Sequence, residues 1–223
     1  MYPNSQVVEA QNRLPSPERA MCVGKCARCT GLSLMLLALL SITSNLFLLF
    51  PNLDGSYLRR RQISSYARFL SGVWAGGLMV LLASIQITTT GFKVRRLSCC
   101  GPRCDMFLSG VSSFVALLGA TISLLVSVAG LFSGPYCLLQ ENDGAAQKWD
   151  YPKHNIFNNS SVVMVPDMSS WSGACIEPPY IETWHSSFFI LMSMSNILQI
   201  MLCLSQIVNV IFGVLCGHCD QKK

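Results

Sequence analysis

The sequence predicts an all-α membrane protein: an antiparallel, up-down-up-down four-helix transmembrane bundle with a small and a large extracellular loop. Two observations support this fold class. Charged residues make up 12% of the 223 residues and hydrophobic residues 51%, whereas soluble domains usually carry about 25% charged residues. In addition, four long stretches contain no Asp, Glu, Lys or Arg: Thr30–Leu53, Phe69–Phe92, Met106–Gln140 and Thr183–Cys219.

Each charge-free stretch is long enough to cross a bilayer. A spanning helix needs about 20 mostly apolar residues, and backbone in lipid must satisfy its own hydrogen bonds, which favours helices. Four such runs in one chain argue against buried helices of a soluble core. We expect spans at residues 31–50, 70–92, 107–132 and 186–215, separated by segments 1–30, 51–69, 93–106, 133–185 and 216–223. Residues 1–20 are polar and are expected to be disordered.

The distribution of Lys and Arg sets the expected orientation. Segments 1–30, 93–106 and 216–223 together carry ten of these residues, and the two other connections carry six. The positive-inside rule therefore favours cytosolic termini, although Arg59-Arg60-Arg61 lies on the opposite side. We expect a multi-pass protein of the plasma membrane or an endosomal membrane, with both termini in the cytosol.

The long connection, residues 133–185, carries two further signals of an outer location. Asn158 and Asn159 each begin a glycosylation sequon, a signal of a surface loop in a secreted or lumenal segment. The same connection holds two cysteines, Cys137 and Cys175, which are expected to form a disulfide. Closing a loop of about 37 residues should stabilise it by roughly 3–4 kcal/mol.

Eight of the remaining cysteines border the membrane on the predicted inner side, and we call them the flank cysteines: Cys22, Cys26, Cys29, Cys99, Cys100, Cys104, Cys216 and Cys219. Cytosolic cysteines next to a span are usual sites of reversible palmitoylation. The alternative is a zinc site, in which Cys22, Cys26 and Cys29 meet Cys216-Gly217-His218-Cys219. Inert free thiols remain a third possibility.

Small residues recur inside the spans at a spacing that predicts helix contacts. Hydrophobicity does not drive helices together in lipid, so small and polar residues mark the contact faces. The third span carries the clearest series, and the second carries Gly72-x3-Gly76, which is predicted to pack within the bundle or, alternatively, against a partner helix. The third series includes Ser113, Ala116, Ala120 and Ser123.

The sequence offers little to catalysis, nucleic-acid binding or active transport. It contains three histidines, and none stands in a hydrolase triad order, a metalloprotease motif or a nucleotide-binding loop. We therefore expect no enzyme, no cofactor, no bound metal and no nucleic-acid partner. The basic excess lies beside the spans, which suggests anionic lipid as a partner. The absence of ionisable residues from the spans argues against a pump.

Several motifs resemble those of the transmembrane 4 L-six family, and the resemblance runs from Met21 to about Cys219. The opening Met21-Cys-x-Gly-Lys-Cys-Ala-Arg-Cys29 carries it, with Phe50-Pro51-Asn52, Gly72-x-Trp74-x-Gly76-Gly77-Leu78-Met79, Gly134-Pro135-x-Cys137, Trp171-x3-Cys175-x-Glu177-Pro178 and Trp184. A tetraspanin would carry Cys-Cys-Gly and at least four cysteines in its large outer loop, whereas the long connection of this chain holds two cysteines. The resemblance implies a glycoprotein that gathers integrins, receptors and tetraspanins into microdomains and influences adhesion, migration and growth.

Two functional hypotheses follow. In the first, the chain is a non-enzymatic organiser, and Trp149, Tyr151 and Trp171 of the large loop either contact partners or fill the loop's own core. In the second, the chain transports or senses a small ligand or lipid through a polar pocket between helices. That pocket would be lined by Gln86, Asn196, Gln199 and Gln206, whose alternative role is hydrogen bonding between helices. The oligomeric state is not predicted.

Overall fold

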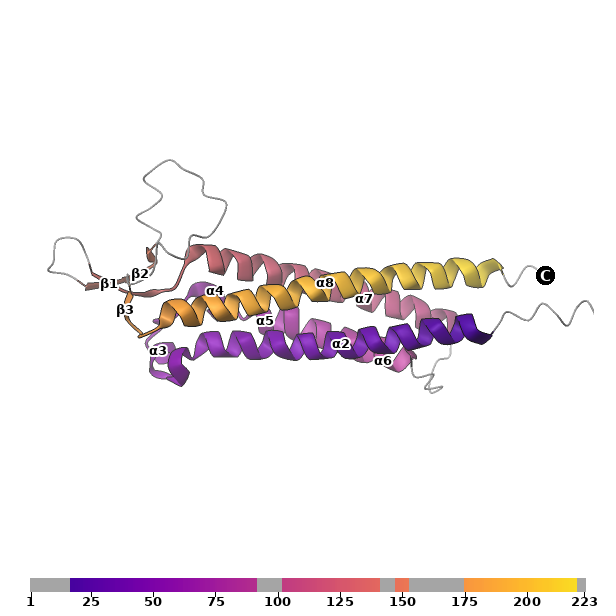
Figure 1. Cartoon of the computed structure of the whole chain (residues 1–223), viewed down its shortest axis with the longest axis horizontal. Helices are drawn as coiled ribbons and strands as arrows, with labels where there is room; N and C mark the ends of the chain where they lie inside the picture. The colour runs from indigo at the N-terminus through magenta and orange to yellow at the C-terminus, as the bar shows by residue number, and fades with distance from the viewer. Residues whose placement is uncertain (1–16, 92–101, 141–146, 153–174, 220–223) are drawn as a thin grey trace, which may run out of the picture.

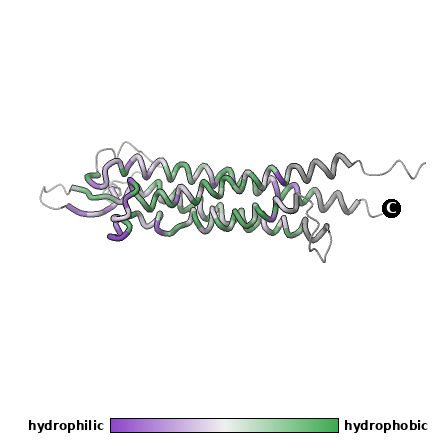
Figure 2. Tube along the Cα trace, turned by 90° about the horizontal axis from the view of Figure 1, so that it is seen from below, coloured by the Kyte–Doolittle hydropathy of each residue, from purple (hydrophilic) through white to green (hydrophobic). Residues whose placement is uncertain are grey.

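A computed structural model describes residues 17–91, 102–140, 147–152 and 175–219. Within these residues, four helical segments are long and apolar enough to cross a membrane: Ala27–Leu49, Ser71–Thr89, Phe107–Ser133 and Ile181–Phe212. The predicted all-α four-pass bundle is therefore confirmed. Figure 2 shows that hydrophobic residues predominate in the middle of the helices, whereas hydrophilic residues gather at the left of the view, at the end away from the C-terminus.

The helices form an antiparallel bundle in chain order. Helix α2 (Pro17–Leu49) packs against α6 (Val80–Gly91), α6 packs against α7 (Pro102–Ser133), α7 packs against α8 (Ile181–Cys219), and α8 returns to α2. Helix α2 begins and α8 ends at the same end of the bundle, which we call the terminal end (Figure 1). The described parts of the connections 50–70 and 134–180 lie at the opposite end, which we call the loop end.

The helices extend beyond the predicted spans. Helix α2 begins at Pro17, inside the segment expected to be disordered, and Pro suits the first turn of a helix because it lacks an N–H that would go unpaired there. Helix α8 covers Ile181–Cys219 instead of residues 186–215. Hydropathy locates the apolar middle of a helix, but polar turns at either end continue the same backbone hydrogen bonds in water.

The second span is not a uniform α-helix. It begins with α5 (Ser71–Val73), continues through the π-helical segment η3 (Trp74–Met79), and becomes α6 at Val80. Leu70 precedes it in a left-handed conformation, with φ 56°, and the indole nitrogen of Trp74 donates to the Phe69 carbonyl at 3.2 Å. π-helical turns occur frequently at functional sites.

The small connection is folded. It contains the 3-10 turn η2 (Pro51–Leu53), α3 (Ser56–Arg59) and α4 (Ser65–Arg68). The Asp54 carboxylate accepts hydrogen bonds from the backbone N–H of Ser56 at 2.9 Å and from its hydroxyl at 2.8 Å. These two bonds lower the pKa of Asp54 below its ordinary value and hold the start of α3 in place.

The large connection contains a small antiparallel sheet that the sequence analysis did not foresee. Strand β1 (Cys137–Gln140) lies between β2 (Gln147–Asp150) and β3 (Cys175–Glu177). Leu138 pairs with Trp149 on one side and Glu177 on the other. These strands are too short to show an alternating pattern, so they could not be predicted from the sequence.

Candidate functional site

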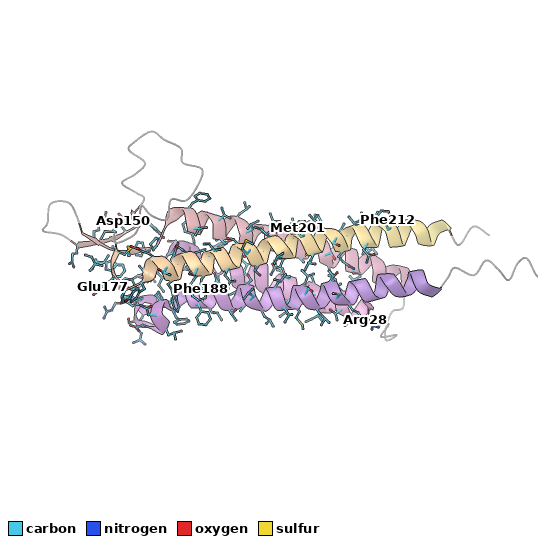
Figure 3. The ribbon with its side chains drawn as sticks, in the orientation of Figure 1. Arg28, Asp150, Glu177, Phe188, Met201 and Phe212 are labelled. Atoms are coloured by element: carbon cyan, nitrogen blue, oxygen red, sulfur yellow. A yellow bond between two sulfur atoms is a disulfide. The ribbon has the colours of Figure 1, made fainter. Side chains whose placement is uncertain are left out.

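Cys137 and Cys175 are joined by a disulfide at the loop end, with their Cα atoms 5.6 Å apart. Cys137 opens β1 and is fully buried, and Cys175 opens β3. The bridge therefore fastens the two ends of the large loop to each other beside the points where they leave α7 and enter α8. Figure 3 shows Asp150 and Glu177 at this loop end, far from Arg28 near the terminal end.

An aromatic cluster joins the large loop to the small one. The rings of Tyr136 and Tyr151 lie 5.0 Å apart between centroids, and Trp149 lies 6.1 Å from Tyr136 and 6.4 Å from Tyr57 of the small loop. The hydroxyl oxygen of Tyr151 accepts a hydrogen bond from the backbone N–H of Ser65 at 3.0 Å. Trp149 and Tyr151 are half-buried and therefore form part of the packing between the two loops. Trp171 lies outside the described residues.

Hydrogen bonds also join α8 to α2 and the large loop to the small one. The Trp184 indole donates to the Phe47 carbonyl at 2.9 Å, and the Asn52 amide nitrogen donates to the Pro179 carbonyl at 2.9 Å. Beneath them, His185 is buried with Nε2 3.1 Å from the Gly130 carbonyl oxygen. The two loops and the ends of the helices thus form one packed unit.

Two large side chains project from this unit. Tyr180 is 84% exposed and Leu53 is 71% exposed, and both adopt left-handed backbone conformations, with φ 60° and 62°. Such conformations are unfavourable for residues other than glycine and tend to persist where function requires them. The Asn52–Pro179 bond places the two segments side by side. Together with the exposed Ile176 of β3, we call Leu53 and Tyr180 the apolar tip. The apolar tip could not be predicted from the sequence, because the feature that marks it is the left-handed backbone conformation of Leu53 and Tyr180.

The centre of the bundle is assembled around the glycines of the second span. A Cβ atom on Gly76 would lie 2.6 Å from Asn196 Oδ1, 2.7 Å from Ser123 Oγ and 2.8 Å from Ser41 Oγ. A Cβ atom on Gly72 would lie 2.6 Å from the sulfur of Met192. Gly72 and Gly76 therefore face the interior, where α2, α7 and α8 approach them, and not a helix outside the bundle.

Polar side chains connect the helices at this level. Asn196 Nδ2 donates to Ser123 Oγ at 2.9 Å, Gln199 Nε2 donates to the Gly76 carbonyl at 3.0 Å, and the hydroxyl of Ser193 donates to Ser127 Oγ at 2.9 Å. The small residues of α7 lie on the same buried face. These are Ser113, Ala116, Ala120 and Ser123, each fully buried.

The four polar residues proposed to line a pocket are not brought together. Asn196 and Gln199 meet the second span at Gly76, whereas Gln86 lies about 15 Å further along that helix and is exposed, where it accepts a hydrogen bond from Ser112 Oγ. Gln206 donates to Ser109 at 3.4 Å. Two cavities among the described residues, one of about 280 Å³ and one of about 20 Å³, are lined by none of these four residues.

The predicted modification sites are only partly within view. Cys29 is described and exposed, and Cys203 is buried in the bundle. Five other flank cysteines belong to the helix turns of the terminal end, although their side chains are not described: Cys22, Cys26, Cys104, Cys216 and Cys219. Cys99, Cys100, Asn158 and Asn159 lie outside the described residues.

Comparison with known proteins supplies the family. The family model described as L6 membrane protein matches residues 21–220. The chain is 38% identical over 208 residues to human transmembrane 4 L6 family member 5, which covers 91% of this chain and 98% of the relative. It is 36% identical over 203 residues to member 19 of Mus musculus, covering 90% and 95%. It is 34% identical over 207 residues to human member 1, covering 89% and 96%.

No solved structure was found to match the chain. The family model and the relatives nevertheless cover the whole bundle and both loops, in agreement with the resemblance carried by the sequence motifs. With four apolar helices, a disulfide-bridged large loop and this match over residues 21–220, the chain belongs to the L6 membrane protein family.

Proposed function

We propose that this chain is a non-enzymatic organiser that gathers other integral membrane proteins around itself. The partners implied by the family resemblance are receptors, integrins and tetraspanins, and the consequences would be altered adhesion, migration and growth. The observation that carries the proposal is the apolar tip, which stands on a loop end that is itself fastened to the bundle. Exposed aromatic and aliphatic side chains on a rigid support favour protein contacts.

The packing of the loop end supports this role. Because the disulfide, the aromatic cluster and the Asn52–Pro179 bond fix both loops, little conformational entropy would be lost when a partner binds there. The side chains of the apolar tip are not used in that packing. They remain available for contact, whereas Trp149 and Tyr151 are already engaged.

Orientation and modification complete the proposal. The loop end would face the cell exterior or an endosomal lumen, with glycans on Asn158 or Asn159, and both termini would lie in the cytosol. The flank cysteines at the terminal end would carry palmitoyl chains. Because four helices already anchor the chain, acylation would change which lipids and proteins surround it.

Transport or ligand sensing has weaker support. Asn196 and Gln199 form hydrogen bonds with neighbouring helices, and a Cβ at Gly76 would already collide with three side-chain oxygens. A pathway between these helices would need open space, and the close contacts around Gly76 fill the space at that level of the bundle. The polar groups are therefore better explained as contacts between helices.

Proximity labelling in living cells tests the proposal. A labelling enzyme fused to the C-terminus should mark a set of membrane proteins, and the double variant Ile176→Ser with Tyr180→Ser should lose much of that set. Lys148→Ser is the matched control, because Lys148 is also exposed on the sheet and its side chain forms an ion pair of 3.1 Å with Asp150 of the same strand. Equal labelling by the wild type and the tip variant, at equal surface abundance, would contradict the role of the tip.

A further inference from the structure

One cavity is an apolar groove on the outside of α2 at the loop end. It has a volume of about 280 Å³ and is lined by Thr43, Leu46, Phe47, Phe50 and Leu53. The apolar span of α2 ends at Leu49. The groove therefore begins within the hydrocarbon region and continues beyond it, so that it crosses the level at which a lipid tail joins its headgroup.

A basic turn stands beside the upper part of this groove. A Cβ atom on Gly55 would lie 3.9 Å from the ring of Phe50, which places the start of α3 against a groove residue. The backbone N–H of Arg59 donates to the Gly55 carbonyl at 3.3 Å, so Arg59 lies one helical turn from that contact. Arg60 and Arg61 follow directly, and all three arginines are exposed.

The charge of this turn is only partly offset by its neighbours. Asp54 is the nearest acidic residue in the chain, and its carboxylate, which accepts hydrogen bonds from the backbone N–H and hydroxyl of Ser56, also interacts electrostatically with Arg60. In the described ranges, the ion pair found joins Lys148 to Asp150, and no carboxylate pairs with any of the three arginines. Three exposed arginines, with one carboxylate beside them, therefore belong to the turn that packs against the apolar groove.

We propose that this groove and basic turn form a binding site for an anionic phospholipid of the leaflet at the loop end. One acyl chain lies along Leu46 and Phe47, and the phosphate meets the guanidinium groups of Arg59–Arg61. Guanidinium groups match phosphate oxygens with paired hydrogen bonds. This site goes beyond the organising role and does not depend on it.

The chemistry predicts which part of the lipid is discriminated. An acyl chain gains little by leaving other lipid tails for an apolar groove, because the two surroundings are similarly apolar. The headgroup must therefore supply the selectivity. A basic residue near an anionic lipid surface is worth about a five-fold change in binding, so three arginines should favour an anionic over a zwitterionic headgroup by at least about ten-fold.

Native mass spectrometry of the full-length protein in detergent tests the site. The protein is titrated with phosphatidylglycerol and, separately, with phosphatidylcholine of the same acyl chains. The triple variant Arg59→Gln, Arg60→Gln, Arg61→Gln should lose the ten-fold preference for phosphatidylglycerol. Arg68→Gln is the matched control, because Arg68 is an exposed arginine of the same connection that ends a different helix, α4, and this variant should retain the preference.

A second pair of variants tests the groove itself. Leu46→Trp fills the groove with an indole and should weaken binding of phosphatidylglycerol, whereas Leu36→Trp places the same side chain at another exposed position of α2 and should not. Equal binding of the two lipids by the wild type would overturn the proposal. So would an equal loss in the Arg68 control, which would indicate general surface charge. If inorganic phosphate displaced the lipid while Leu46→Trp had no effect, the site would bind a soluble anion and not a lipid.

Discussion

Replacing Gly76 with alanine should open the bundle, because the new methyl group has no space. It would lie 2.6–2.8 Å from side-chain oxygens of Asn196, Ser123 and Ser41, which belong to α8, α7 and α2. A carbon needs more distance than this from each oxygen, and the three oxygens enclose it from three helices. No single side-chain rotation relieves all three contacts, so at least one helix must move.

The size of the effect follows from two contributions. Forcing an extra methyl group into a packed interior usually costs about 1–3 kcal/mol. Movement of α8 would also strain the Asn196–Ser123 and Gln199–Gly76 hydrogen bonds, and such bonds between membrane helices contribute on average about 0.6 kcal/mol each. We therefore expect Gly76→Ala to destabilise the bundle by about 2–4 kcal/mol.

The buried thiol of Cys203 provides the assay. Cys203 is free and has no exposed surface in the bundle. In a background with the eight flank cysteines changed to serine, it is the remaining thiol outside the Cys137–Cys175 bridge. If labelling requires opening, a cost of 2–4 kcal/mol should accelerate its reaction with a maleimide by about 30- to 1,000-fold.

Gly110→Ala is the control for this experiment. Its Cβ atom would meet one side-chain carbon of Val210 at 3.2 Å, with the next nearest atom at 4.0 Å, so a small adjustment of Val210 can accommodate it. Alanine also favours the helix more than glycine does. The control should label at about the wild-type rate. Wild-type labelling by Gly76→Ala itself would refute the packing argument.

Three other predictions concern the loops and the flank cysteines. Changing Cys137 and Cys175 to serine should destabilise the loop end by about 4 kcal/mol, for a loop that spans 38 positions, and reduce the fraction of protein that reaches the cell surface; unchanged surface abundance would argue against it. Removal of N-glycans should increase electrophoretic mobility, and the double variant Asn158→Gln with Asn159→Gln should abolish that shift, whereas a glycan retained by the double variant would locate the site elsewhere. Changing the flank cysteines to serine should remove acyl-exchange labelling and weaken co-isolation of partners while leaving Cys137–Cys175 bridged; about one bound zinc per native chain, with no labelling, would favour the metal site instead.

The bundle was predictable because its causes are local in sequence. A charge-free run of sufficient length is stable in lipid as a helix, because a helix satisfies its own backbone hydrogen bonds. The series from Ser113 to Ser123 follows one face of a single helix. All four named members of that series are buried. Length, charge and spacing along one segment contain all the information that these two predictions required.

The remaining features depend on residues far apart in the chain. The sheet forms because β1 finds partners on both sides from within a long connection. Gly76 faces the interior because Asn196, 120 residues later, reaches it. The exposure of Tyr180 depends on a backbone conformation and on the bond between Asn52 and Pro179. None of these contacts produces a periodic pattern or an unusual composition within a single segment, so none can be predicted from one segment alone.

The environment of Gly76 also separates hydroxyl groups that hold the bundle together from those that only fill space. Ser123 Oγ accepts the amide of Asn196, whereas Ser41 Oγ and Asn196 Oδ1 are buried without a hydrogen-bond partner among the described residues. Both of these oxygens lie against the Cα hydrogens of Gly76, a contact that contributes less than an N–H···O bond.

Ser123→Ala should therefore leave the Asn196 amide without its acceptor and accelerate labelling of Cys203. Ser41→Ala removes an oxygen that was itself unsatisfied, and it should leave the labelling rate nearly unchanged, because replacing an unpaired buried polar group with an apolar one costs little. Equal rates for the two variants would mean that the polar groups at the bundle centre act only through their volume.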